Sequence, residues 1–252
     1  MRLGLCLIMM LVLARPDAQA AQDDLPTCMG QGAPQRCMCE IGQLRPTQVS
    51  LGFLHVQDIL RDEPSKLQAR AREKPTQVVI GPDRRLYVTD GHHHARAMLE
   101  QSRQGTGPAT TICQVVEDDS AMAPSGREAF LVWLADHGHA RLNGGDDMGG
   151  AIRPGLYPPE TLDMMTNDTY RSLASFMEDG CRFKAQGDFG EFPLADLMRQ
   201  VQVRAPSELA HKNDQGRRAA AELVAGLGTG PMRTAFQVLP YHDKIEGCSA
   251  VP

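Results

Sequence analysis

The sequence predicts an α+β fold, in which a small mixed-sheet core over residues 40–120 is followed by a mainly helical extension over residues 121–252. Two runs rich in β-branched residues, 77–80 and 85–89, flank a Gly-Pro-Asp turn and predict a β-hairpin. The second run leads through an Asp-Gly pair directly into a segment with helical periodicity. Near residue 120 helical patterns replace strand patterns, so we expect the extension to consist of helices that pack on the core.

The spacing of apolar residues and the positions of Gly and Pro predict the other elements. Helices are expected at residues 51–60, 63–73, 92–101, 127–137, 169–178, 194–203 and 207–227, and a third strand at 111–116. Pro64 in the first turn and Pro75 after the last turn delimit the second helix. Residues 43–48 are expected to run from a strand end into a turn, and the Gly- and Pro-rich residues 144–159 to form an ordered loop or a linker.

The first twenty residues have the three-part layout of a secretory signal peptide. Arg2 precedes an apolar run over residues 3–13, and residues 18–20, Ala-Gln-Ala, fit a small-x-small cleavage site. The run is shorter than the roughly 18 apolar residues that a membrane helix needs, and no later stretch reaches that length. We therefore expect residues 1–20 to be removed and the mature chain to be periplasmic or secreted, without a membrane span. Residues 21–39 are expected to form a cysteine-containing, irregular N-terminal arm.

Cysteine usage predicts disulfide bonds in the mature chain. Removal of Cys6 with the signal peptide leaves six cysteines, an even number: Cys28, Cys37, Cys39, Cys113, Cys181 and Cys248. In an exported chain this number favours structural disulfides that fasten the arm and the C-terminal tail to the core. Six cysteines allow about 15 pairings, which the sequence does not resolve. A metal or redox role for Cys37 and Cys39 is an alternative, although one intervening residue is an unusual spacing for both.

The mature chain is acidic. Loss of Arg2, Arg15 and Asp17 leaves 24 basic and 30 acidic side chains, a net charge of −6. A protein that holds duplex DNA by neutralising phosphates usually has the opposite balance. The composition therefore counts against binding to a duplex DNA operator, while a local basic groove stays compatible with it.

Residues 90–94, Asp-Gly-His-His-His, lie where a predicted strand passes into a predicted helix. The first N–H groups of a helix have no partner inside the helix and lie at the positive end of its dipole, so such a place binds phosphate or carboxylate. Imidazole groups beside it add hydrogen-bond donors and can transfer protons near neutral pH. Asp90 is expected to orient one imidazole, to act as a base or to hold a cation.

The same turn also has a purely structural interpretation. An Asp at a helix start is often only an N-cap, and surface histidines are often without function. Successive helical side chains diverge by about 100°, so at most two of the three histidines can share a site with Asp90. A zinc site is not predicted, because the His-x-x-x-His spacing is absent.

Residues 86–97, LYVTDGHHHARA, resemble the signature of ParB-like families, in which a strand leads to Gly, then to polar or basic residues and a helix. Residues 44–48 resemble the first box of the ParB/sulfiredoxin superfamily. Further along, residues 168–174 and 189–199 resemble the tail of the ParB-like nuclease family. The resemblance spans about residues 40–200 and implies a ParB/sulfiredoxin-like core.

The resemblance also implies roles for individual residues. It implies phosphate binding by Gly91, His92, His93, His94 and Arg96, catalysis by Asp90, His92 and His93, and support from Arg45, Thr47, Gln48 and Tyr87. His94 stands where Arg is common, so Arg96 is expected to supply part of the phosphate contact. Gln48 lies near where the free serine kinases of the superfamily have a catalytic Glu, and an amide cannot act as a base. His92 replaces the sulfiredoxin Cys, which excludes sulfinic-acid reduction through that thiol.

Further candidates lie in the extension. Glu191 and Asp196 could line the same cleft as the histidine turn, but capping and ion pairing with Arg199 is the favoured interpretation. Arg171 is expected to be buried against a carboxylate.

Two main hypotheses for function follow. The first is an exported, nuclease-like phosphoester hydrolase that acts on a phosphate-containing small molecule or on single-stranded nucleic acid, with a divalent cation as one option at the site. The second is a binding module that holds a nucleotide or a small anion without turnover. A nucleotide-dependent small-molecule kinase is a third alternative, which Gln48 disfavours. No helix-turn-helix with a basic recognition helix follows the core, so partition-type operator binding is not expected.

Overall fold

The computed structural model describes residues 25–28, 35–121, 123–124, 126–144, 153–154, 157–180 and 191–200. The expected signal peptide, Cys181, Cys248 and the helix expected at 207–227 lie outside these residues. Among the described residues, no helix combines the length and the apolar character that crossing a bilayer requires.

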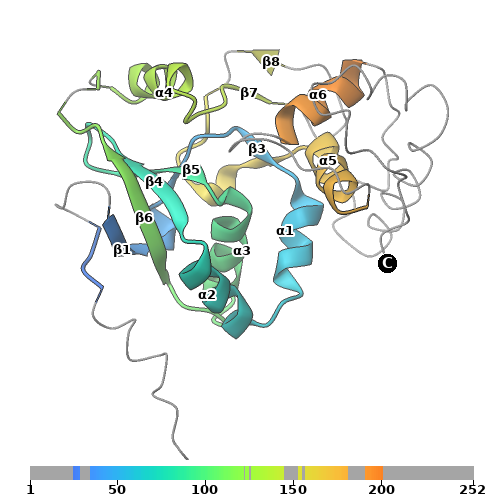
Figure 1. The fold of residues 1–252 in the computed structure, drawn as a ribbon, viewed down its shortest axis with the longest axis horizontal. Helices are drawn as coiled ribbons and strands as arrows, with labels where there is room; N and C mark the ends of the chain where they lie inside the picture. Colours follow the sequence, from blue (N-terminus) through green and yellow to red (C-terminus); the bar gives the residue numbers. More distant parts are fainter. Residues whose placement is uncertain are drawn as a thin grey trace, which may run out of the picture.

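A mixed sheet of five strands forms the centre of the fold, in the order β1-β6-β4-β5-β2 (Figure 1). The strands are β1 (Gln35–Glu40), β2 (Arg45–Pro46), β4 (Thr76–Ile80), β5 (Leu86–Asp90) and β6 (Thr110–Asp118). Strands β4 and β5 form the predicted antiparallel hairpin, while β6 is parallel to β4 and β2 is parallel to β5. The α+β class with a mixed sheet is therefore confirmed.

Strand β1 differs from the sequence-based expectation of an irregular arm up to residue 39. It pairs antiparallel with β6, and Cys37 lies opposite Cys113. The inward-facing positions of β1 are Cys37 and Cys39, both buried. Because the strand carries cysteines rather than β-branched residues at these positions, the usual alternation of apolar and polar residues was not visible in the sequence.

The sheet is buried on both faces. On β4, Val78 and Ile80 belong to one apolar core, whereas Val79 between them belongs to a second one. On β5, Val88 and Tyr87 divide in the same way, as the two-residue period of a strand requires.

Three helices supply the first core and one supplies the second. The first three are α1 (Phe53–Leu60), α2 (Pro64–Glu73) and α3 (His92–Arg103), and the fourth is α4 (Arg127–Asp136). Figure 1 shows α2 and α3 against the sheet, with α1 beyond α3. Phe130, Leu131 and Leu134 of α4 cover the opposite face, where Phe130 meets Tyr87 edge to face with 4.8 Å between ring centroids.

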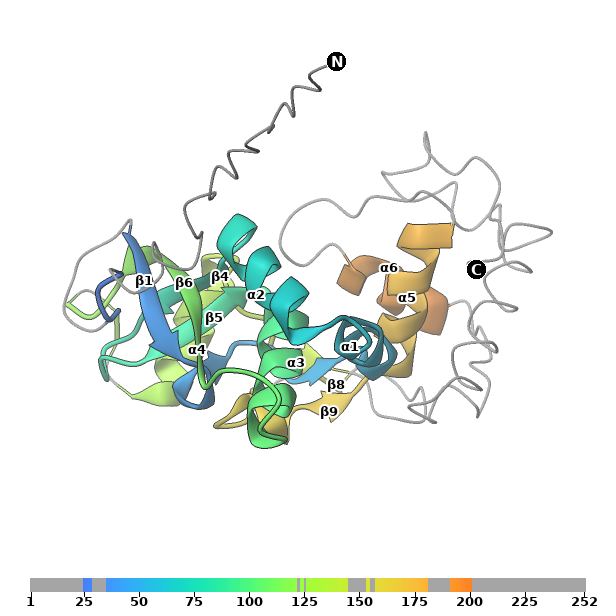
Figure 2. The same cartoon turned by 90° about the horizontal axis from the view of Figure 1, so that it is seen from below.

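The extension is joined to the core at the start of α1. Strand β3 (Ser50–Leu51) pairs in parallel with β9 (Thr166–Asn167), and the Asn167 side chain accepts a hydrogen bond from the Phe53 amide at 2.9 Å. Gly52 allows this approach, because a Cβ on it would lie 2.7 Å from the Ser172 backbone nitrogen. Helix α1 thus lies between α3 and the helices of the extension, α5 (Thr169–Gly180) and α6 (Glu191–Gln200) (Figure 2).

The connection between α4 and α5 contains only short elements among its described residues. They are β7 (Asn143–Gly144), β8 (Arg153–Pro154), the 3₁₀ turn η3 (Leu162–Met164) and the strand β9 described above. A further 3₁₀ turn, η2 (Ile41–Gln43), precedes β2.

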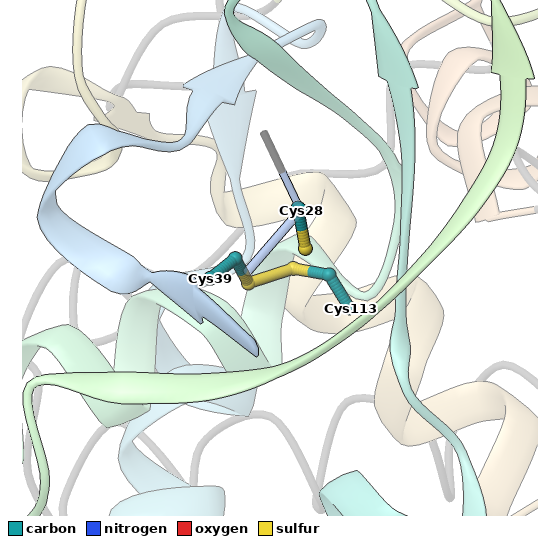
Figure 3. Close-up of side chains that lie close together, drawn as sticks. All are labelled: Cys28, Cys39 and Cys113. Carbon is teal, nitrogen blue, oxygen red and sulfur yellow. A yellow bond between two sulfur atoms is a disulfide. The ribbon is translucent and has the colours of Figure 1, made fainter. Parts of the chain in front are cut away.

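Two disulfide bonds confirm the structural role expected for four of the six cysteines. Cys28 is bonded to Cys37. Cys39 is bonded to Cys113, and Figure 3 shows this bond with Cys28 beside it. The sulfur atoms of Cys28, Cys39 and Cys113 lie within 4.8 Å of one another, which resembles a metal-binding group. Each of the three is consumed in a disulfide, so in this state the group offers no thiolate to a metal.

Asp119, which follows β6, is a buried carboxyl group with no hydrogen-bond partner for either oxygen among the described residues. Burial, together with the negative charge of Glu117, raises the pKa of Asp119 to about 6, and His139 opposes this change. Because the folded-state pKa lies above the unfolded one, the folded state binds more protons between about pH 4 and 6.

The contribution of Asp119 to stability is therefore expected to fall by about 2 kcal/mol as the pH rises from 4 to 7, since a tenfold difference in proton affinity corresponds to about 1.4 kcal/mol. Asp119→Asn should remove this decrease, so the variant should be more stable than the parent chain at pH 7 and close to it at pH 4. Urea unfolding at both pH values measures the difference. Equal pH dependence in the two proteins contradicts the assignment.

Candidate anion site at the start of α3

Helix α3 begins at the end of β5 with an uncapped N-terminus. Gly91 is the N-cap residue and has φ 90°, a left-handed conformation that glycine adopts without strain. No side chain in the described part of the chain caps this helix. Asp90 does not act as the cap, because its Oδ1 accepts a hydrogen bond from the adjacent Gly91 amide at 2.7 Å. The first amides of α3 are thus oriented to receive a hydrogen-bond acceptor from outside the helix.

A cavity of about 140 Å³ lies at this helix start. It is lined by Gln48, His55, Arg70, Lys74, Asp90, Gly91, His92, His93, His94, Arg171 and Glu191. Three of these side chains are basic and two are acidic, so with neutral imidazoles the residues that line the cavity have a net charge of +1. The chain as a whole has a negative net charge, whereas the net charge of the cavity lining is positive.

His92 is the most buried of the three histidines, with 3 % of its surface exposed. Its Nε2 accepts a hydrogen bond from the Thr47 amide at 3.2 Å. The Thr47 hydroxyl cannot supply another proton to Nε2, because it donates to the Val88 carbonyl at 2.6 Å. The ring proton of neutral His92 must therefore be on Nδ1, which has no hydrogen-bond partner among the residues that the structure describes.

Burial and the positive charge of Arg171 lower the pKa of His92 to about 3. The imidazole is consequently neutral at physiological pH and offers one donor, the Nδ1–H group. His92 is thus suited to bind an anion rather than to exchange protons. A buried donor without a partner costs free energy, which a bound acceptor would recover.

His93 faces α1 and α6. Its ring stacks on His55 of α1, with 4.4 Å between centroids and 30° between planes. Its Nε2 is buried and unpartnered within the described chain. Burial and the nearby His55 lower the pKa of His93 well below the usual range, so this imidazole is neutral as well. Together with Glu191, the two rings form a cluster whose ligand-type atoms all lie within 4.8 Å of one another.

Arg171 lines the cavity and contacts other residues that line it. Its guanidinium donates to the Gln48 side chain at 2.7 Å and to the Ser50 carbonyl at 2.8 Å, and it pairs with Glu191 at 2.8 Å. The same group lies 4.0 Å above the Phe192 ring. The structure thus contains the expected contact between a buried Arg171 and a carboxylate. This ion pair holds Glu191 at the cavity.

The carboxylate of Asp90 and the third histidine lie on the open side. Asp90 pairs with Lys74, the residue after α2, at 3.1 Å. Burial, followed by the charge of Arg70, lowers the pKa of His94 to about 4. All three histidines are therefore neutral near pH 7, and the positive charges of the cavity come from Arg70, Lys74 and Arg171.

Several of the expected site residues lie in the cavity and others do not. Asp90, Gly91, His92, His93, His94 and Gln48 line it, and Thr47 contacts it through His92. Arg96 is directed elsewhere, since it pairs with Glu100 at 2.8 Å and donates to the Leu162 carbonyl. Arg96 follows His92 by about one turn of α3, so its side chain lies further from the start of the helix than the imidazole of His92.

Arg45 and Tyr87 also lie away from the cavity. Arg45 pairs with Glu160 at 2.7 Å and lines a second, larger cavity of about 350 Å³ beside β1. None of the three histidines of residues 92–94 lines that second cavity. Tyr87 projects to the α4 side of the sheet, where its hydroxyl donates to Asp83 at 3.0 Å. Successive side chains of β5 point to opposite faces of the sheet, and the neighbours of Tyr87 face α3. Tyr87 therefore faces α4.

Sequence reasoning missed three cavity residues, His55, Arg70 and Lys74. His55 lies inside the apolar pattern of α1, where a single His is usually structural. Arg70 lies in the last turn of α2 and Lys74 directly follows the helix, and two basic residues so close together could have indicated a basic patch. Of the two carboxylates in the extension, Asp196 pairs with Arg199 as expected, whereas Glu191 pairs with Arg171 and lines the cavity.

Comparisons with known proteins agree with this architecture. A family model described as "Putative ParB-like nuclease" matches residues 37–200. The crystal structure of protein Atu1540 from Agrobacterium tumefaciens is similar, with a TM-score of 0.55 and 24 % sequence identity over 87 % of this chain and 100 % of that chain. At this identity the likeness concerns the fold alone. No functionally curated protein matches the chain. Because the family model covers residues 37–200, which include the whole of the α3 site, the chain belongs to the ParB-like nuclease family.

Proposed function

We propose that the cavity at the start of α3 binds the phosphate group of a phosphate ester or phosphodiester, and that the protein hydrolyses this bond. The observation that carries the proposal is the buried Nδ1–H group of His92, which has no partner in the described structure and lies beside an uncapped helix N-terminus. Both are donors that an anion would satisfy. Membership of a nuclease-like family supports the choice of phosphate over carboxylate.

The size of the cavity limits what it can enclose. A volume of about 140 Å³ lies below the roughly 300–1,000 Å³ of sites that enclose a drug-sized ligand. The cavity therefore suits one phosphate group, with the ester substituents outside it. This fits a small phosphodiester or a single strand, and agrees with the acidic charge of the chain, which disfavours extended contact with duplex DNA.

The hydrolytic step needs a group that activates water. The oxygen of water attacks phosphorus while the ester P–O bond breaks, the water loses a proton, and the departing oxygen gains one from solvent. Glu191 lines the same cavity, and its carboxylate is the group that can take the proton. His92 and the α3 amides would stabilise the charge on the phosphoryl oxygens.

The test is turnover of a chromogenic phosphodiester, single-stranded DNA and RNA, with Mg²⁺, Mn²⁺ or Zn²⁺ added separately. His92→Gln places a carboxamide near the ring position that Thr47 contacts and removes the Nδ1–H donor. We expect this variant to lose about 10²–10³-fold in kcat, the effect of removing one donor to a transition-state oxyanion. Glu191→Gln should lose about 10²–10⁴-fold, the range for a group that transfers protons.

His137→Ala is the matched control, because His137 is exposed and stacks on Trp133 away from the cavity. It should retain the activity of the parent chain. Activity that survives in both His92→Gln and Glu191→Gln, with all variants folded, overturns the assignment of the site.

A binding module without turnover is a second candidate, and a specific observation favours it. The lowered pKa values of His92, His93 and His94 leave these three imidazoles unable to exchange protons near neutral pH. Calorimetric binding of inorganic phosphate that requires the His92 donor, together with absent turnover of every substrate, is the result that selects this candidate. A kinase is not favoured, because Gln48 is engaged by Arg171 and cannot act as a base.

We also propose that the chain works in the periplasm or outside the cell. Two disulfides are typical of an oxidising compartment, and they agree with the signal peptide expected at residues 1–20. A reporter fused to residues 1–25 that stays in the cytoplasm contradicts this localisation.

A further inference from the structure

The cluster beside the anion site points to a metal centre. We propose that His55, His93 and Glu191 bind a Zn²⁺-type divalent ion, with a fourth position open to the cavity. This inference deepens the proposed function and rests on it for the chemical role of the metal. Binding of the ion itself can be tested separately.

The three side chains come from three different elements that meet at the cavity. His55 is on α1, His93 is in the first turn of α3, and Glu191 begins α6. The His55 Nδ1 lies 4.0 Å from Glu191 Oε1, and all three ligand-type atoms lie within 4.8 Å of one another. Around a tetrahedral ion with bonds of about 2.0–2.2 Å, ligand atoms are about 3.3–3.6 Å apart. A closure of roughly 1 Å would bring the three groups to that spacing.

Two observations indicate that the cluster is prepared for a ligand. The Nε2 of His93 is buried and lacks a hydrogen-bond partner among the described residues, although its side chain lines a polar cavity. Glu191 is held by Arg171 through Oε2, so its Oε1 is the oxygen that faces His55. A carboxylate oriented in this way by an outer partner is typical of metal ligands.

The ligand set defines the class of metal. Two imidazoles and one carboxylate are one of the protein ligand sets of catalytic zinc sites, which leave a fourth position for water or substrate. Mg²⁺ and Ca²⁺ prefer oxygen ligands throughout, so they fit this set poorly. The positive charge of Arg171 lowers the affinity, which makes a moderate rather than a very tight site the expected result.

A metal at this point would serve the proposed hydrolysis directly. Zn²⁺ lowers the pKa of a bound water to near neutrality, which supplies the attacking hydroxide without an imidazole base. The proton would be released to solvent. His93 would then act as a ligand, while His92 and the α3 amides hold the phosphate.

The experiment is a titration of the purified, tag-free chain, first stripped with EDTA, with Zn²⁺ by calorimetry and with Co²⁺ by visible absorption. We expect one equivalent to bind, and Co²⁺ to give the absorption of a four- or five-coordinate site. His55→Ala, His93→Ala and Glu191→Gln should each weaken binding more than the ~10–100-fold that loss of an outer partner costs. His137→Ala should bind like the parent chain, and Mg²⁺ should show no saturable binding.

Absence of stoichiometric Zn²⁺ binding overturns the inference, as does equal affinity in the parent chain and in all three folded variants. Thermal unfolding of each variant without metal identifies any that fails to fold, and Glu191→Gln keeps the shape of the side chain for this reason. Phosphate binding by the metal-free chain is measured in parallel. If the chain binds phosphate but not Zn²⁺, only the metal site is contradicted. If it binds Zn²⁺ but neither binds phosphate nor turns over a substrate, the proposed function is contradicted and the metal site stands.

Discussion

Replacement of Arg171 with Met is expected to lower the free energy of unfolding by about 3–5 kcal/mol, the cost of breaking a buried ion pair by removing one partner. Arg171 is 3 % exposed and satisfies Gln48, the Ser50 carbonyl and Glu191 at once. Met fills a similar volume but removes the donor from the buried Gln48 side chain and Ser50 carbonyl, and the ion-pair partner from the partly exposed Glu191. Urea unfolding of the parent chain and the variant at pH 7 measures the loss.

Two further variants identify the cause of this loss. Arg171→Lys keeps the charge but lacks the planar, multidentate donor, so it should recover only part of the stability. In a double-mutant cycle with Glu191→Gln, the coupling energy should lie at the upper end of the roughly 0.5–3 kcal/mol range for residues in contact. A loss below about 1 kcal/mol in Arg171→Met would show that solvent reaches this pair.

Loss of the Cys39–Cys113 disulfide is expected to lower stability by about 4.5 kcal/mol, according to the chain-entropy model for a loop of this length. The two residues are 74 positions apart, and the bond joins β1 to β6. The Cys28–Cys37 bond closes a separation of only 9, for which the same model gives about 2.7 kcal/mol. The double substitution Cys39→Ala with Cys113→Ala should therefore be the more damaging of the two pairs.

Urea unfolding of both double-alanine variants provides the comparison, and thiol titration of the unfolded parent chain provides the control. A parent chain whose cysteines at 28, 37, 39 and 113 all react as free thiols would contradict both pairings. A larger loss for the Cys28–Cys37 pair than for the Cys39–Cys113 pair would show that native packing around β1, and not the closed loop, determines the effect.

Much of the core was predictable because its signals are local. The hairpin of β4 and β5 follows from two β-branched runs around a Gly-Pro-Asp turn, and α3 follows from the glycine that ends β5. The resemblance placed phosphate chemistry at the same turn, and the family match over residues 37–200 confirms the family. Strand β1 was missed, because its buried positions are cysteines.

The cavity itself was predictable only in part. Residues 90–94 are contiguous, and the local strand-to-helix geometry brings them to the helix start. Arg96 and Tyr87 were expected at the same site, but their side chains point away from the cavity. Arg96 lies one turn further along the helix and Tyr87 faces the other side of the sheet. Proximity in sequence does not determine which way a side chain points.

The sequence by itself determined the α+β class, the hairpin, the glycine at the start of α3 and the cysteine framework, because each depends on neighbouring residues or on composition. Only the tertiary structure decided that His55, His93 and Glu191 meet. These side chains come from α1, α3 and α6, and the contact depends on how α1 packs between the core and the extension. The tautomer of His92 was decided in the same way, because the donor that fixes it is the Thr47 amide, 45 residues away in the chain. The local sequence therefore determines where the turn lies, and long-range packing determines its chemistry.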